Sequence, residues 1–217
     1  MLILLSGFGI VSALLQLGSE HASDQVKSAS YFAFSNRFGV CFNLGLSAIV
    51  LLVGLLIPLP IKGSNQLLLM MTLLPMLQII RDLQIINLRV NLRNRAFSYA
   101  NTTNVILTSI MTILGAWLFS TRGIVFSQYL VVILMILILA FKMKVPFFVK
   151  GDSLERQEKK DLLQIAGVSA LNNALTQLLT LLGAFVLGLV VMDEDAIASY
   201  KVATTIPFAL NFIPSSL

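Results

Sequence analysis

Long apolar runs recur along this sequence, and they constrain its fold more than any other feature. Several approach the length of about 20 residues that an α-helix needs to cross a bilayer. The runs are continuous, whereas strands of a membrane barrel alternate apolar and polar residues. The chain is 57% hydrophobic and only 12% charged, against about 25% charged residues in soluble domains. These features predict an all-α integral membrane protein.

About seven membrane-spanning helices fit within the 217 residues. The expected spans are residues 1–17, 38–57, 66–88, 103–119, 124–141 and 162–192, with a last span from residue 200 onward. The first span is short for a full crossing, and the last runs off the end of the chain. We therefore expect the sequence to be a piece of a longer membrane protein, truncated at both ends.

The basic residues are shared unevenly between the two sides of a membrane. Eleven of the fifteen Lys and Arg residues fall in the loops after the first, third and fifth spans, three fall on the other side, and Arg81 lies within a span. Because cytoplasmic loops carry the excess of Lys and Arg, the first set of loops is expected in the cytoplasm. The net charge of +5 is explained by this topology, so binding of nucleic acid is not expected.

The third expected span, residues 66–88, contains charged residues. Arg81 and Asp82 lie within it, and Gln78 lies one turn before Arg81 on the same helix face. A charge at membrane depth costs about 2.5–3.5 kcal/mol on insertion scales, so it marks a candidate site. Adjacent residues point about 100° apart around a helix, so Arg81 and Asp82 are not expected to pair with each other. Arg81 either binds an anion in a water-filled cavity or extends toward the cytoplasm, and the sequence leaves both readings open.

Polar residues also follow one face of the sixth expected span. Asn173, Thr176, Gln177 and Thr180 have the spacing of one helix face. Each of them alone suits a hydrogen bond between helices, whereas the stripe as a whole predicts the wall of a hydrophilic cavity.

Prolines predict bends in two spans. Pro75 lies within the third span, and Pro207 and Pro214 lie seven residues apart in the last span with Asn211 between them. Such breaks are tolerated where the backbone lines a cavity or is buried in protein. Lys201, at the outer end of the last span, is either a membrane anchor or a second cationic ligand.

No catalytic or metal-binding motif stands out. The sequence contains neither HExxH nor GxSxG, and its single histidine, His21, lies in an expected loop. The single cysteine, Cys41, lies in an apolar run and is expected to pack in the interior. We therefore expect a protein that is not an enzyme and that binds no metal or cofactor.

Three segments carry a family resemblance: residues 6–20 (SGFGIVSALLQLGSE), 88–107 (LRVNLRNRAFSYANTTNVIL) and 196–217 (AIASYKVATTIPFALNFIPSSL). They resemble the second helix, the fourth-to-fifth helix junction and the start of the second lobe of bacterial polysaccharide-biosynthesis flippases. These flippases belong to the multidrug/oligosaccharidyl-lipid/polysaccharide exporter superfamily. The resemblance implies a two-lobed MATE-like transporter fold. Residues 1–141 would form most of the N-terminal lobe (family helices 2–6), 142–161 a cytoplasmic linker, and 162–217 the start of the C-terminal lobe (family helices 7–8).

The resemblance also implies a function. Members of this family flip lipid-linked oligosaccharides across the bacterial inner membrane by alternating access, and the implied substrates are undecaprenyl-pyrophosphate-linked O-antigen or capsule repeat units. The implied partners are membrane lipid, a coupling cation (H⁺ or Na⁺) and the polysaccharide polymerase machinery. The implied ligands of the pyrophosphate are Arg81 first and Lys201 second. The other cavity candidates are Gln78, Asp82, Asn173, Gln177 and Asn211.

Three other functions remain open. A multidrug or cation antiporter of the same superfamily would rely on acidic residues within the membrane, and Asp82 is the one acid in the expected spans. A membrane enzyme such as a glycan polymerase would need large outer loops, and the expected loops on that side are short. An inactive truncated fragment is compatible with the same sequence features.

Overall fold

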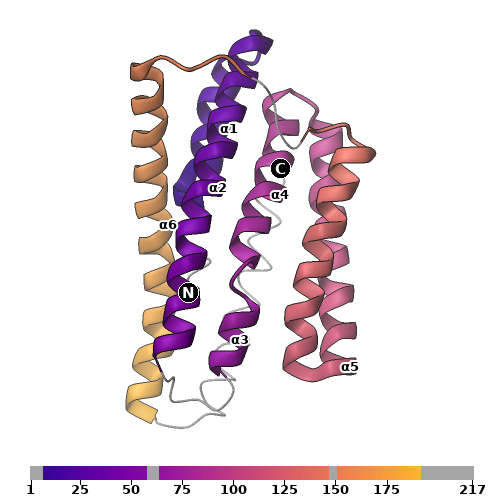
Figure 1. The fold of residues 1–217 in the computed structure, drawn as a ribbon, viewed down its shortest axis with the longest axis vertical. Coiled ribbons are helices and arrows are strands. Elements are labelled where there is room, and N and C mark those ends of the chain that lie inside the picture. Colours follow the sequence, from indigo (N-terminus) through magenta and orange to yellow (C-terminus); the bar gives the residue numbers. More distant parts are fainter. Residues whose placement is uncertain (1–6, 58–63, 147–150, 192–217) are drawn as a thin grey trace. The chain divides into compact units, whose positions relative to one another are not determined.

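The computed structural model describes residues 7–57, 64–146 and 151–191, and these are mostly helical (Figure 1). The helices of this part of the chain are α1 (Ile10–Glu20), α2 (Gln25–Leu56), α3 (Ser64–Met70), α4 (Leu74–Val90), α5 (Asn94–Phe141) and α6 (Arg156–Val191). No strand occurs among the described residues. The all-α class predicted from the sequence is therefore confirmed for them.

The chain divides into two compact units, Met1–Ala170 and Leu171–Leu217, and the division falls inside α6. The first unit contains α1 to α5 and the beginning of α6. Of the second unit, the structure describes the remainder of α6. The seventh expected span lies outside the described residues.

Two helices in the described ranges are long and apolar enough to cross a membrane, α2 and α5. Both carry large apolar side chains on their surfaces, including Leu56, which is 75% exposed, and Trp117, which is 81% exposed. Exposed apolar surface of this kind suits contact with lipid or with another protein. The two helices are a weak indication of a membrane protein.

α5 is a hairpin of two helical arms. Its 48 residues are interrupted by non-helical backbone at Phe119 and Ser120 (Figure 1). The arms approach so closely that a Cβ atom on Gly115 would meet the carbonyl oxygen of Gly123, and a Cβ atom on Gly123 would meet the carbonyl of Gly115. The side chain of Ser127 donates a hydrogen bond of 2.7 Å to the carbonyl of Gly123. Only glycine, which has no Cβ atom, permits this contact.

The third expected span consists of two helices rather than one. α3 ends at Met70 and α4 begins at Leu74, with a turn between them. Pro75 lies in the first turn of α4, where its missing N–H would have no partner within the helix. The hydroxyl of Thr72 donates a hydrogen bond of 2.8 Å to the carbonyl of Leu69, within this connection. The chain is thus redirected just before Pro75.

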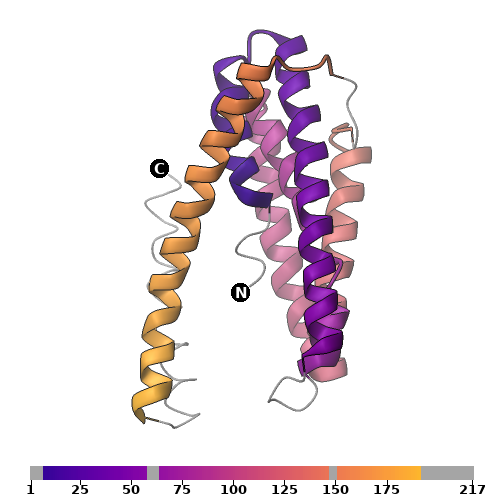
Figure 2. The same ribbon diagram turned by 60° about the vertical axis from the view of Figure 1, so that its left-hand side comes forward.

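α4 lies between the other helices of the first unit and packs against α1, α2 and α5 (Figures 1 and 2). Ile79 and Leu83 join α1, α2 and the start of α6 in one apolar core. Ile85 and Leu88 join α5 in a second core. Arg81, in the middle of α4, is consequently largely enclosed, with 13% of its side chain exposed.

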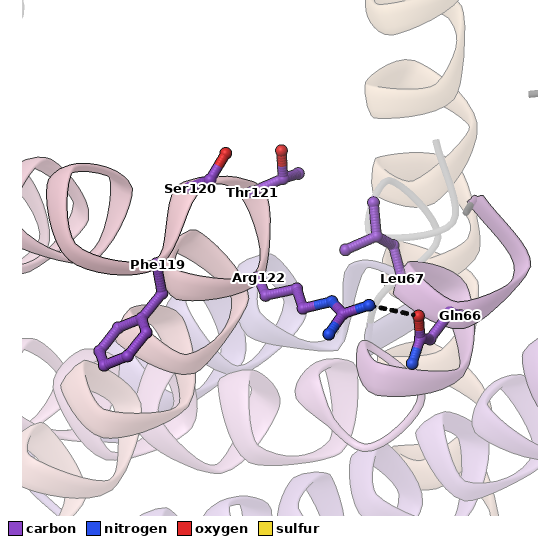
Figure 3. Close-up of a pocket in the computed structure, with 6 residues that line it drawn as sticks. All are labelled: Gln66, Leu67, Phe119, Ser120, Thr121 and Arg122. Atoms are coloured by element: carbon purple, nitrogen blue, oxygen red, sulfur yellow. Dashed lines mark hydrogen bonds between the residues drawn. The ribbon is translucent and has the colours of Figure 1, made fainter. Parts of the chain in front are cut away.

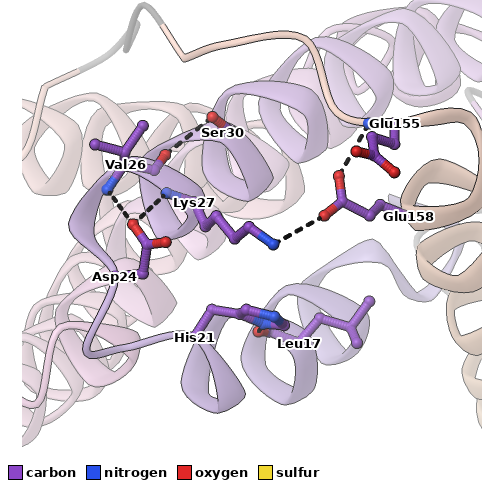
Figure 4. A network of polar contacts seen from close by, with 8 residues as sticks. All are labelled: Leu17, His21, Asp24, Val26, Lys27, Ser30, Glu155 and Glu158. Carbon is purple, nitrogen blue, oxygen red and sulfur yellow. Dashed lines mark hydrogen bonds and ion pairs between the residues drawn. The ribbon is translucent and has the colours of Figure 1, made fainter.

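The basic connections lie at one end of the first unit (Figure 1). Arg93, between α4 and α5, donates a hydrogen bond of 2.9 Å through Nη1 to the carbonyl of Met143, just after α5. Lys27, near the start of α2, pairs with Glu158 in the first turn of α6, with 3.4 Å between Nζ and Oε1 (Figure 4). The connections expected on the cytoplasmic side are therefore neighbours in space.

Several helices extend beyond the spans expected from hydropathy. α2 begins at Gln25, well before residue 38, because Asp24 caps it: Oδ1 of Asp24 accepts hydrogen bonds of 3.1 Å from the N–H groups of Val26 and Lys27 (Figure 4). α6 begins at Arg156, inside the expected linker 142–161. These helices therefore continue through charged residues beyond the apolar runs, and the side chains of those residues are mostly exposed.

Candidate functional site

Arg81 and Asp82 form an ion pair in the middle of α4. Arg81 donates to Oδ1 of Asp82 through Nε at 2.9 Å and through Nη2 at 2.8 Å. The expectation that these adjacent residues would not pair is therefore wrong. Their Cβ atoms point about 100° apart, but the long side chain of Arg81 folds back toward the neighbouring carboxylate.

The same guanidinium group reaches the first arm of α5. Nη1 of Arg81 donates to Oδ1 of Asn104 at 3.5 Å, a long hydrogen bond. Two turns further along α4, Arg89 lies over the ring of Phe97, 5.4 Å from its centroid. This face of α4 thus follows the beginning of α5 in antiparallel order. Asn104 was not predicted as a site residue, because nothing near it in the sequence indicates that it faces Arg81.

The depth of Arg81 bears on the choice between an internal ligand and a membrane anchor. It lies nine residues before Val90, the end of α4, or about 14 Å at the rise of an α-helix. Its guanidinium group contacts Asp82 and Asn104 at its own level. The geometry therefore favours a polar cluster inside the bundle over a side chain that extends to the basic end of the first unit.

The two members of the pair are enclosed unequally. The side chain of Arg81 is 13% exposed and that of Asp82 is 41% exposed. The three contacts to Asp82 and Asn104 engage three of the five N–H groups that a guanidinium carries. The cation is therefore the more enclosed partner of the pair.

Gln78 is the other cavity candidate in the described part of the first unit. Gln78 is partly exposed on the preceding turn of α4. Asn173 is exposed in the second unit, where the hydroxyl of Thr176 donates a hydrogen bond of 2.9 Å to the carbonyl of Asn172. Gln177 lies in α6, but its side chain is outside the description. Lys201, Pro207, Asn211 and Pro214 lie outside the described residues.

α2 contributes buried polar residues that the sequence analysis did not single out. Asn36 and Asn43 are 4% and 0% exposed, and Nδ2 of Asn43 donates a hydrogen bond of 2.8 Å to the carbonyl of Gly39. Gly39 in turn lies against Ile79 and Leu83 of α4. The spacing of seven residues between the two asparagines, which places them on one helix face, is the signal that could have identified this internal face.

A small pocket of about 250 Å³ lies at the tip of the α5 hairpin (Figure 3). Nη2 of Arg122 donates a hydrogen bond of 2.9 Å to Oε1 of Gln66 across it. The hydroxyl groups of Ser120 and Thr121 point away from this hydrogen bond (Figure 3). The pocket joins α3 to the hairpin and does not include the charged pair of α4.

Two further features concern metal and thiol chemistry. No cluster of three or more His, Cys, Asp or Glu side chains suited to a metal ion occurs in the ranges that the structure describes. Cys41 is exposed, so the expectation that it packs in the interior is wrong. It lies on the face of α2 that points away from α4, which hydropathy alone does not distinguish from the inner face.

Comparison of the chain with family models, with curated proteins and with solved structures found no match. A functional proposal for this chain therefore depends on its own residues and geometry.

Proposed function

We propose that this chain is part of a bacterial inner-membrane flippase for lipid-linked oligosaccharides, of the undecaprenyl-pyrophosphate type that carries O-antigen or capsule repeat units. The observation that carries the proposal is the Arg81–Asp82 pair with Asn104, in which the guanidinium group belongs to a side chain that is only 13% exposed in an apolar bundle. Ionisable groups at such depth are costly and mark sites of function. Arginine binds phosphate oxygens through two parallel N–H groups, which suits a diphosphate.

In this mechanism the carboxylate of Asp82 is paired with the guanidinium group of Arg81 when no substrate is bound. The diphosphate carries more negative charge than one carboxylate, so it displaces Asp82 from Arg81. When the substrate leaves on the other side, Asp82 returns. The cation is thus compensated at each stage, which a low-dielectric environment requires because an unpaired buried charge is strongly destabilising.

The proposed protein is a multi-pass, two-lobed transporter of the MATE-like type. Gln78 lies near Arg81 and would contact the substrate from the first lobe. Lys201, Asn173, Gln177 and Asn211 would contact it from the second lobe. Pro75, Pro207 and Pro214 would supply the bends about which the lobes change conformation. Support comes from the apolar exposed surfaces of α2 and α5 and from the grouping of basic connections at one end.

Complementation of a strain that lacks its O-antigen flippase tests the proposal. The chain, and separately a version extended at both ends, would be expressed, and surface polysaccharide would be measured. Rescue by the extended version alone would identify the 217 residues as an incomplete transporter. Rescue by neither, with both proteins in the membrane, would count against the flippase.

The role of Arg81 is tested in whichever version is active. Arg81→Ala should abolish export at normal protein abundance, and Arg81→Lys should retain part of it, because lysine keeps the charge but not the planar pair of donors. Arg122→Ala, at the tip of α5, is the matched control and should export normally. Undiminished export by Arg81→Ala would remove Arg81 from the mechanism.

A multidrug or cation antiporter on the same fold is the second candidate. The observation in its favour is the 41% exposure of the Asp82 side chain, which leaves a carboxylate accessible to an exchanging cation. Asp82→Asn distinguishes the two candidates. It should abolish drug resistance conferred by an antiporter, whereas a flippase should keep measurable export, because Arg81 remains.

A further inference from the structure

A groove of about 520 Å³ lies at the basic end of the first unit, with a lining separate from the Arg81 cluster. One wall is a face of α2 that includes Phe34, Arg37, Phe38 and Cys41. The opposite wall includes Asp152 and, from the first turn of α6, Lys159.

The segment that precedes α6 is fixed against α2. A Cβ atom on Gly151 would lie 2.6 Å from Cα of Ser30, so the backbone approaches α2 as closely as only glycine allows. Three residues later, Leu154 is 7% exposed and belongs to the same apolar core as Tyr31 and Phe32 of α2. Both ends of the segment 151–154 are therefore anchored, and the groove is formed before any ligand binds.

Along α2 the lining includes Phe34, then Arg37 about one turn later, and then Phe38 and Cys41. Arg37 is exposed and immediately precedes residues 38–57, the apolar run expected to cross the membrane. Next to it, the rings of Phe34 and Phe38 stack with centroids 6.3 Å apart and planes inclined by 14°. Cys41, one turn further, is exposed within the apolar part. The groove thus has cations at the expected membrane boundary, with Phe38 and Cys41 on the membrane side of Arg37 and Phe34 on the side of the basic end.

We propose that this groove binds the phosphate headgroup of an anionic membrane phospholipid, with Arg37 and Lys159 at the phosphate and an acyl chain along Phe38 and Cys41. Basic pockets at the cytoplasmic ends of membrane helices bind anionic headgroups through charge attraction. A free phosphate ion would gain nothing from the aromatic wall. Asp152 limits the excess positive charge, which suits a headgroup with a single negative charge. This lipid site is independent of the proposed flippase function.

Cys41 reports the occupancy of the groove without any substitution, because it is the only cysteine of the chain. The full chain in a nonionic detergent would be titrated with phosphatidylglycerol, and the rate of alkylation of Cys41 by a water-soluble maleimide would be measured. Phosphatidylcholine is the probe without net charge, and inorganic phosphate is the probe without acyl chains. Phosphatidylglycerol should slow the alkylation, and the other two should not. Equal slowing by either of them, or no slowing by phosphatidylglycerol, would overturn the proposal.

A matched pair of double variants tests the two cations. Arg37→Gln with Lys159→Gln removes both from the groove, and Arg95→Gln with Lys160→Gln removes two exposed cations that do not line it. Native mass spectrometry would measure bound phosphatidylglycerol. We expect binding to weaken about fivefold for each groove cation removed and to stay unchanged in the control pair. If both double variants bound phosphatidylglycerol equally more weakly, the lipid would be attracted by the overall charge of the protein alone, and the proposed site would be refuted.

Discussion

Arg81 and Asp82, consecutive residues of α4, are joined by an ion pair of 2.8 Å in which the cation is the more enclosed partner. Asn104 of α5 contacts the same guanidinium group at 3.5 Å. The cation therefore depends on a carboxylate that is less enclosed than itself. Because the two side chains differ in exposure, removing one should change the free energy of unfolding by a different amount from removing the other.

Removal of Asp82 should destabilise the protein more than removal of Arg81. Asp82→Ala leaves an enclosed guanidinium group without its anion, which lowers the free energy of unfolding by about 1–3 kcal/mol. Arg81→Ala leaves a carboxylate that is 41% exposed and partly solvated, so it should cost less. The double variant should recover part of the loss. Unfolding of the purified variants in detergent measures all three, and strictly additive losses would contradict a coupled pair.

The tip of the α5 hairpin should not tolerate a side chain at Gly115. Gly115→Val places atoms where the backbone of Gly123 lies, and overpacking of this kind costs about 1–3 kcal/mol or more. Gly45→Ala in α2 is the control, because a Cβ atom there meets nothing within 4 Å. It should leave stability unchanged or raise it by about 0.5–1 kcal/mol. Thermal unfolding followed by circular dichroism compares the two. A Gly115→Val protein as stable as the original would refute the close approach of the arms.

The beginning of α2 should depend on its cap. Asp24→Ala removes the acceptor for the N–H groups of Val26 and Lys27 (Figure 4) and should cost about 1 kcal/mol. Asp24→Asn keeps an oxygen acceptor at the same position and should be close to neutral. The rate of hydrogen exchange at the backbone N–H groups in the first turn of α2 measures the loss of the cap directly. Faster exchange in both variants alike would mean that the negative charge, rather than the hydrogen bonds, stabilises this end.

Opposite ends of the first unit should face opposite sides of the membrane. In a Cys41→Ser background, Arg95→Cys lies at the basic end and Thr121→Cys at the tip of α5; both native side chains are exposed. A membrane-impermeant maleimide should label Thr121→Cys in spheroplasts and Arg95→Cys in inverted vesicles, as the excess of Lys and Arg predicts. Labelling of both positions from one side would contradict the topology.

Local features explain how much of the fold was predictable. The apolar runs predicted a helical chain, and the break between the expected spans 103–119 and 124–141 corresponds to the reversal within α5. The ends of helices were predicted less well. Hydropathy reports where a chain is apolar, whereas a helix such as α2 continues through solvated polar residues up to its cap at Asp24. The site was predictable in part, since Arg81 and Asp82 were identified by their charge within an apolar stretch.

By itself the sequence determined the all-α class, the excess of basic residues in one set of loops, and Arg81 and Asp82 as the charges that need partners. These properties depend on residues close together in the chain. Only the tertiary structure decided that Arg81 reaches both Asp82 and Asn104, that Asn43 is buried, and that Cys41 is exposed beside Arg37. Each of these depends on side-chain conformation and on which helices pack together, and the periodicity of a single helix does not specify its neighbours.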